Sequence, residues 1–106
     1  MSRPPTLRRQ LAQASRQRQR RILDFRVERV LTLLKDENLA TRAALDLKSK
    51  DGILLECNFI DEVWQDARVA ARIRQLGERG VVVEPVSHEF EVAGRPFSRS
   101  QIRVRF

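Results

Sequence analysis

The sequence predicts an α+β domain in which two helices lie on one face of a single antiparallel sheet. Three observations support this class: apolar residues recur at helical spacing in two segments, they alternate in others, and turn-forming residues separate the segments. The predicted order of elements is α-β-β-α-β-β-β. With 106 residues, the chain is long enough for one such domain with a modest core.

The first helix is predicted over 7–35. Its second half carries an apolar stripe at positions i, i+4, i+7 and i+11, which requires a partner surface. The stripe consists of Leu23, Val27, Val30 and Leu34. Thr6 precedes the helix as a capping residue, and Asn38 is the candidate for a left-handed residue that ends it.

Charge is concentrated at the amino end of this helix. Residues 1–21 contain seven of the 21 basic residues and none of the 14 acidic ones, so residues 22–106 carry no net charge. We therefore divide the chain into a basic extension, 1–21, and a single α+β domain, 22–106. The extension has few apolar residues, and we expect it to be helical when bound to a partner and frayed when free.

A β-hairpin is predicted over 43–60, with its turn at 50–52. A three-residue loop places the apolar residues of both strands on one face, and burial of that face specifies the register. Gly52 then supplies the left-handed residue of a bulge. The same register places Asp46 opposite Glu56 on the polar face.

A second helix is predicted from Asp61 to Leu76, because acidic residues lead it and arginines finish it, the order that the helix dipole favours. It carries two apolar faces, and the face around Trp64 is typical of a helix that packs on a sheet. The other face consists of Val69, Ile73 and Leu76. We expect the first helix to cover this face, and the alternative is an interface with another chain.

Three further strands complete the predicted sheet. They are expected at 81–84, 88–92 and 97–106. Pro85 ends the first of them or confines it to a sheet edge. In the last strand Ile102 and Val104 share one face and the arginines share the other. Phe97 has the wrong parity for this pattern, so a bulge is predicted near 98–100.

The arginines are the strongest functional signal in the chain. A guanidinium group binds phosphate through two hydrogen bonds and stays charged at physiological pH. The predicted phosphate contacts are Arg8, Arg9, Arg16, Arg18, Arg20 and Arg21, supplemented by Arg99, Arg103 and Arg105. The first hypothesis is a small non-enzymatic protein that binds DNA or RNA, or belongs to a nucleoprotein assembly.

Two alternatives remain open. In the first, the chain is an adaptor or homo-oligomeric assembly subunit whose interface is the face of Val69, Ile73 and Leu76, and the arginines bind an acidic protein. In the second, it is a metal-dependent nuclease or an inactive relative, with Mg²⁺ held by Asp46 and Glu56. A simpler explanation of those two carboxylates is that Lys48, between them, neutralises both.

Composition excludes several kinds of site and segment. A single cysteine, Cys57, excludes an internal disulfide and a cysteine-rich metal site. No apolar run approaches the roughly 20 residues that a membrane span requires. We expect no metal and no cofactor outside the nuclease alternative, and a cytoplasmic or nucleoid-associated location. The arginine-rich, acid-free start also fits a mitochondrial transit peptide.

Overall fold

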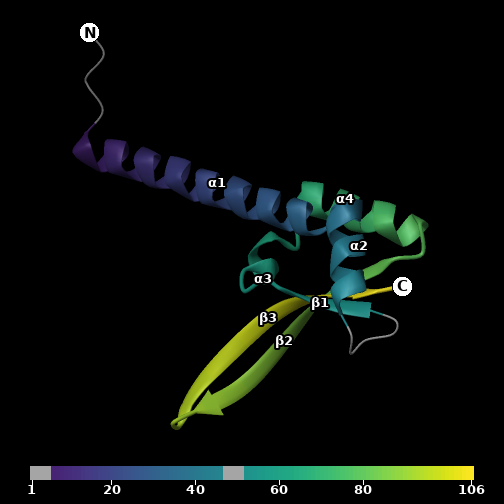
Figure 1. The fold of residues 1–106 in the computed structure, drawn as a ribbon. Coiled ribbons are helices and arrows are strands. Elements are labelled where there is room, and N and C mark those ends of the chain that lie inside the picture. Colours follow the sequence, from purple (N-terminus) through teal and green to yellow (C-terminus); the bar gives the residue numbers. More distant parts are fainter. Residues whose placement is uncertain (1–5, 47–51) are drawn as a thin grey trace.

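The computed structural model describes residues 6–46 and 52–106 of the chain. In order, the elements are α1 (Leu7–Leu33), α2 (Asp36–Leu45), β1 (Gly52–Glu56), α3 (Ile60–Val63), α4 (Ala67–Glu78), β2 (Val82–Val92) and β3 (Arg95–Arg105). The strands form an antiparallel sheet in the order β1-β3-β2, and the long helices gather on one side of it (Figure 1). The predicted α+β class is confirmed.

The core lies between these helices and the inner face of the sheet. On that face Ile53 of β1 and Val83 of β2 both pair with Val104 of β3, and all three side chains are buried. Val27 and Val30 of α1 are completely buried over them. Their spacing is the helical spacing of the predicted apolar stripe, so the stripe is the part of α1 that holds the helix to the domain.

The first helix begins where the sequence predicts. Thr6 caps it, with the Thr6 hydroxyl accepting a hydrogen bond from the backbone N–H of Arg9 at 3.4 Å. Residues 7–21 are helical in this structure and continue into the buried part of α1 without a break. The helix ends at Leu33, and the predicted left-handed role of Asn38 is wrong because Asn38 lies inside α2.

The predicted hairpin over 43–60 is wrong. Residues 43–45 are the last turn of α2, and β1 pairs with β3 instead, as in the pair Leu55–Ile102. Helical spacing of Leu39 and Ala43, which both pack against the core, outweighs the short alternating pattern on which the prediction depended. The part of the prediction over 47–51 falls outside the described residues.

Gly52 is the first residue of β1 rather than a turn residue. It faces Arg105 in the register of the sheet, and its φ is not in the left-handed region. A Cβ atom at this position would lie 2.6 Å from the carbonyl oxygen of Val104. Glycine is therefore required here for the close approach of β1 to β3.

The predicted helix from Asp61 to Leu76 is two helices. α3 ends at Val63, and Asp66 starts α4 by accepting a hydrogen bond on its side chain from the backbone N–H of Arg68 at 2.9 Å. A carboxylate in the capping position favours a new helix start at this point.

Val69, Ile73 and Leu76 pack within the chain itself. Val69 and Leu76 are buried in the core, and Ile73 is partly buried against it. α4 contacts both α1 and β2, so these elements cover the second apolar face, as the sequence analysis favoured. The three residues do not form an exposed interface in this structure.

β2 and β3 form one long antiparallel ribbon. The two strands predicted at 81–84 and 88–92 are a single strand, with Pro85 on the sheet edge that β2 forms. The register runs unbroken from Val82–Arg105 to Val92–Arg95. The predicted bulge near 98–100 is therefore absent. Phe97 lies on the outer face of the sheet, the face opposite to Ile102 and Val104, so no bulge is needed to bring it into register.

A two-residue turn joins the strands of this ribbon. Ala93 and Gly94 both have positive φ, 53° and 77°, as expected for the turn type that matches the twist of a hairpin. Glycine adopts this conformation without strain, whereas alanine does so at a cost.

Replacing Ala93 by asparagine is expected to stabilise the protein by about 0.5 kcal/mol, because asparagine tolerates the left-handed region better than alanine. Urea denaturation of the wild type and the variant measures this change. Gly94→Ala is the matched control and is expected to destabilise the protein. Equal effects of the two substitutions would contradict the turn assignment.

Candidate nucleic-acid interface

The amino-terminal half of α1 projects beyond the rest of the molecule (Figure 1). Residues 7–25 are exposed, apart from Ser15, which is half-buried, and the buried residues of α1 lie only in its last turns. At a rise of 1.5 Å per residue, residues 7–21 form a free-standing segment about 22 Å long. We call residues 7–21 the projecting segment.

All six arginines of the projecting segment are exposed to solvent. They are Arg8, Arg9, Arg16, Arg18, Arg20 and Arg21. The first acidic residue of the helix is Asp24, beyond the segment. Within the described part of the chain, none of the six forms an ion pair or a side-chain hydrogen bond.

The arginines of the segment extend the face by which α1 contacts the domain. Arg9, Arg16 and Arg20 follow each other at i, i+7 and i+11, so they share one side of the helix. Continuing the same spacing leads to Val27 and Val30, which are buried. The helix face is thus apolar where it packs into the core and basic where it projects, and a polyanion could bind along the basic part.

Six arginines elsewhere in the described chain are paired with carboxylates: Arg26, Arg68, Arg72, Arg79, Arg99 and Arg105. Arg68 contacts Asp24 at 2.9 Å and Asp66 at 3.1 Å, and Arg26 pairs with Glu62. Unlike these pairs, the projecting segment has no acidic residue within it. The six arginines of the projecting segment are therefore the longest run of arginines along the described chain in which none forms an ion pair.

The arginines predicted on the last strand are only partly available. Arg99 binds Glu56, with Nε at 3.0 Å from Oε2, and Arg105 pairs with Glu84. A hydrogen bond from Gln101, followed by those from Arg99, lowers the pKa of Glu56, so this carboxylate keeps its charge. Of the three arginines, Arg103 alone has no ion pair among the described residues.

The carboxylate pair of the nuclease alternative is not assembled. Glu56 lies opposite Gln101 in the sheet, and Asp46 follows the end of α2, so they are not cross-strand neighbours as predicted. Nor does the described part of the chain contain three or more His, Cys, Asp or Glu residues grouped as a metal site. The arrangement that the Mg²⁺ prediction required is therefore absent from the described residues.

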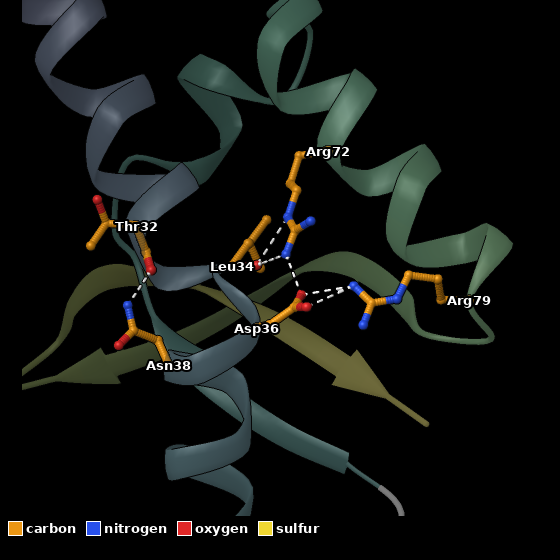
Figure 2. A network of polar contacts seen from close by, with 6 residues as sticks. All are labelled: Thr32, Leu34, Asp36, Asn38, Arg72 and Arg79. Atoms are coloured by element: carbon orange, nitrogen blue, oxygen red, sulfur yellow. Dashed lines mark hydrogen bonds and ion pairs between the residues drawn. The ribbon is translucent and has the colours of Figure 1, made fainter.

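A hydrogen-bond network fixes the direction in which α1 projects (Figure 2). The carbonyl oxygen of Leu34, at the end of α1, accepts hydrogen bonds from Nε and Nη2 of Arg72 on α4, at 3.0 and 2.6 Å. Arg72 also donates to Asp36 of α2 at 2.8 Å. Arg79 donates to both oxygens of Asp36, at 2.8 and 2.9 Å. One cluster thus joins the ends of three helices.

A second contact in Figure 2 joins α1 to α2 directly. The side-chain nitrogen of Asn38 donates to the carbonyl oxygen of Thr32 at 2.5 Å. Carbonyl groups at the end of a helix lack the usual partner in the next turn. Arg72 supplies one for Leu34, whereas the carbonyl oxygen of Thr32 accepts from Asn38 in addition to the backbone N–H of Lys35 at 3.3 Å. The sequence analysis missed this cluster because its members lie in separate helices. The acid directly after the helix end, Asp36, was the only local signal.

Comparison with known proteins adds no functional information. The chain matches no family model, no curated protein and no solved structure at a significant level. Among residues 6–46 and 52–106, no helix combines the length and the apolar character needed to cross a membrane.

Asp36→Asn is expected to destabilise the protein at pH 7 by removing the carboxylate that binds both arginines. Hydrogen bonds from Arg79 and Arg72 lower the pKa of Asp36 from 3.8 to about 2. A carboxylate whose pKa is lowered by folding stabilises the folded state fully at a pH above 3.8, its unfolded pKa. That stabilisation is lost as the pH falls towards about 2, the pKa in the folded state. The difference in the free energy of unfolding between wild type and variant should therefore decrease as the pH falls from 3.8 to 2.

Urea denaturation between pH 7 and pH 2 measures the difference. Glu37→Gln is the control, because Glu37 lies in the same first turn of α2 and forms no ion pair among the described residues. A difference that stays constant down to pH 2 would rule out the ion pairs of Asp36 as its cause.

Proposed function

We propose that the chain is a non-enzymatic nucleic-acid-binding protein and that the projecting segment of α1 contacts phosphate groups. One observation carries this proposal: six exposed arginines, none of which forms an ion pair with a described residue, occupy a helix that extends into solvent. A protein with this role is expected in the cytoplasm or on the nucleoid.

The chemistry of the segment favours phosphate over other anions. Arginine donates two parallel hydrogen bonds to one phosphate, and several phosphates follow one another along a nucleic-acid strand. Arg16 and Arg20 lie four residues apart, where like charges destabilise a helix by about 0.2–0.5 kcal/mol. A polyanion relieves that repulsion. Phosphate contacts of this kind position a protein without reading bases.

The alternatives have less support from the structure. Val69 and Leu76 are buried in the core, so the surface proposed for an assembly subunit is covered. The opposed carboxylates of the nuclease alternative are not present in the register of the sheet. An acidic protein remains the competing partner for the arginines, and a salt titration with nucleic acid distinguishes the two.

The decisive variant replaces Arg8, Arg9 and Arg16 by glutamine, which keeps a similar helix propensity. With about six phosphate contacts, log K for the wild type on duplex DNA should fall with log salt at a slope of about −5. Three lost contacts should reduce the slope to about −3 and weaken binding at every salt concentration. Fluorescence anisotropy with labelled DNA and RNA measures both quantities.

A matched control removes the same charge elsewhere. Replacing Arg29, Arg42 and Arg74 by glutamine also lowers the net charge from +7 by three, and these residues are exposed and outside the projecting segment. If both triple variants weaken binding equally, net charge rather than the segment causes binding. If the wild type binds no nucleic acid at moderate salt, the proposed function is wrong.

A further inference from the structure

The far end of the β2–β3 ribbon also projects from the domain. Figure 1 shows the ribbon extending away from the helices, with its turn at the tip. Every residue from 87 to 99 is exposed, and burial begins only at Ser100 and Gln101. A two-stranded ribbon without a covering layer is only marginally stable in water. We therefore asked whether the exposed faces of this ribbon have a binding role.

The two faces of the projecting ribbon carry opposite charge. Side chains alternate between faces along a strand, and the register of the ribbon shows which residues share a face. One face carries His88, Phe90, Val92, Arg95, Phe97 and Arg99 and has no acidic residue. The other carries Ser87, Glu89, Glu91, Pro96 and Ser98 and has no basic residue. We call the first the aromatic–basic face.

Two phenylalanines form the centre of the aromatic–basic face. Phe90 and Phe97 are directly opposite each other, with ring centroids 5.9 Å apart and ring planes 20° from parallel. As a cross-strand pair they support the ribbon. Their side of the ribbon is nevertheless uncovered, and the two residues remain 45% and 47% exposed. Arg95 lies beside them at the turn and has no ion pair within the described chain.

We propose that the aromatic–basic face binds unpaired bases of a single-stranded nucleic acid, with Phe90 and Phe97 as the stacking surface and Arg95 as a phosphate contact. The inference rests on the proposed function and specifies the form of nucleic acid. A base presents a flat apolar face next to a negative backbone, and this combination complements aromatic rings beside an arginine. Glu89 and Glu91 on the opposite face repel the backbone, so only one face is suitable.

A second copy of the chain is a poorer occupant of this face. Packing two such faces together would add a second set of basic side chains without any acidic residue from the projecting ribbon face to pair with Arg95. A single strand instead brings negative charge to both arginines. Arg99 is already bound to Glu56, so Arg95 is the arginine with no competing partner.

The test compares two labelled 16-mers, oligo-dT and a strand of the same length in which every nucleotide is abasic. Both strands carry the same phosphates, so the ratio of their affinities measures base stacking. The wild type is expected to bind oligo-dT about tenfold more tightly, since stacking on aromatic side chains strengthens binding and tolerates any base. Phe90→Val with Phe97→Val should bring the ratio close to one while keeping strand propensity.

Two controls separate the ribbon from the helix. Glu89→Gln with Glu91→Gln changes the charge of the opposite face and should leave the ratio near ten. The Arg8, Arg9 and Arg16 triple variant should weaken binding to both strands and also leave the ratio unchanged. Urea denaturation establishes that each variant is folded.

A second readout does not depend on the double variant. In a Trp64→Phe background, Phe97→Trp places the only indole on the aromatic–basic face. Oligo-dT is expected to quench its fluorescence, and the abasic strand is not.

Four results would overturn the inference. If the wild type binds both strands equally, bases do not stack and only the helix contacts remain. If the double valine variant keeps the tenfold ratio, the stacking surface lies elsewhere. If neither strand binds but duplex DNA does, this inference fails and the proposed function stands; if duplex DNA does not bind either, both fail. If sedimentation shows a dimer that the valine variant dissociates, a second copy occupies the face.

Discussion

The carboxyl end of α1 is held by the burial of Val27 and Val30 and by the hydrogen bonds from Arg72 to the Leu34 carbonyl, and the position of both projections depends on this joint. The buried residues of α1 lie only near its carboxyl end, so the helix is fixed at that end alone. A small change in the angle of the helix there displaces its amino end most. Arg72 binds the helix end directly, and Asp36 connects Arg72 to Arg79. Because these donors and acceptors come from three helices, the direction of α1 follows from their joint packing.

Charge is arranged differently in the packed domain and in the two parts that project from it, residues 7–21 of α1 and residues 87–99 of the ribbon. Inside the domain, six arginines form ion pairs with carboxylates, most of them across element boundaries, as Arg68 does with Asp24. These exposed pairs contribute little stability individually, but they cancel charge where elements meet. Among the described residues, Arg16 on the helix and Arg95 at the ribbon tip form no such pair, and these are the charges on which the proposed function depends.

Much of the fold could be predicted from local sequence, and the rest depended on contacts between distant segments. The cap at Thr6 and the apolar stripe of α1 are local features. The cap was predicted correctly, and of the stripe Val27, Val30 and Leu34 are buried whereas Leu23 is exposed. The pairing of β1 was predicted wrongly because the partner, β3, lies about 50 residues further along the chain. Alternation over a few residues does not identify a partner at that distance, and the helical spacing of Leu39 and Ala43 was overlooked.

The features of the candidate site also divide into those that the sequence predicts and those that depend on contacts between distant segments. The arginines of the projecting segment could be listed from the sequence, because their exposure follows from a lack of apolar neighbours. Pairing of Arg99 with Glu56 could not, since it depends on the register of β1 with β3. Phe97 is an instructive case: its parity was read as a defect in the strand, although it indicated a second face with its own side chains.

The extended shape has a consequence for how this sequence can change over time. The radius of gyration is 18.7 Å, whereas a compact chain of this length has about 13 Å. Residues in the helix and ribbon projections have few packing neighbours, so shape does not restrict their replacement. Helix or strand propensity, the sign of the charge and, under the proposed stacking role, the aromatic rings of Phe90 and Phe97 are the remaining constraints. Descendants of this chain can therefore differ at most positions of both projections while the buried positions around Val30 and Val104 stay nearly fixed.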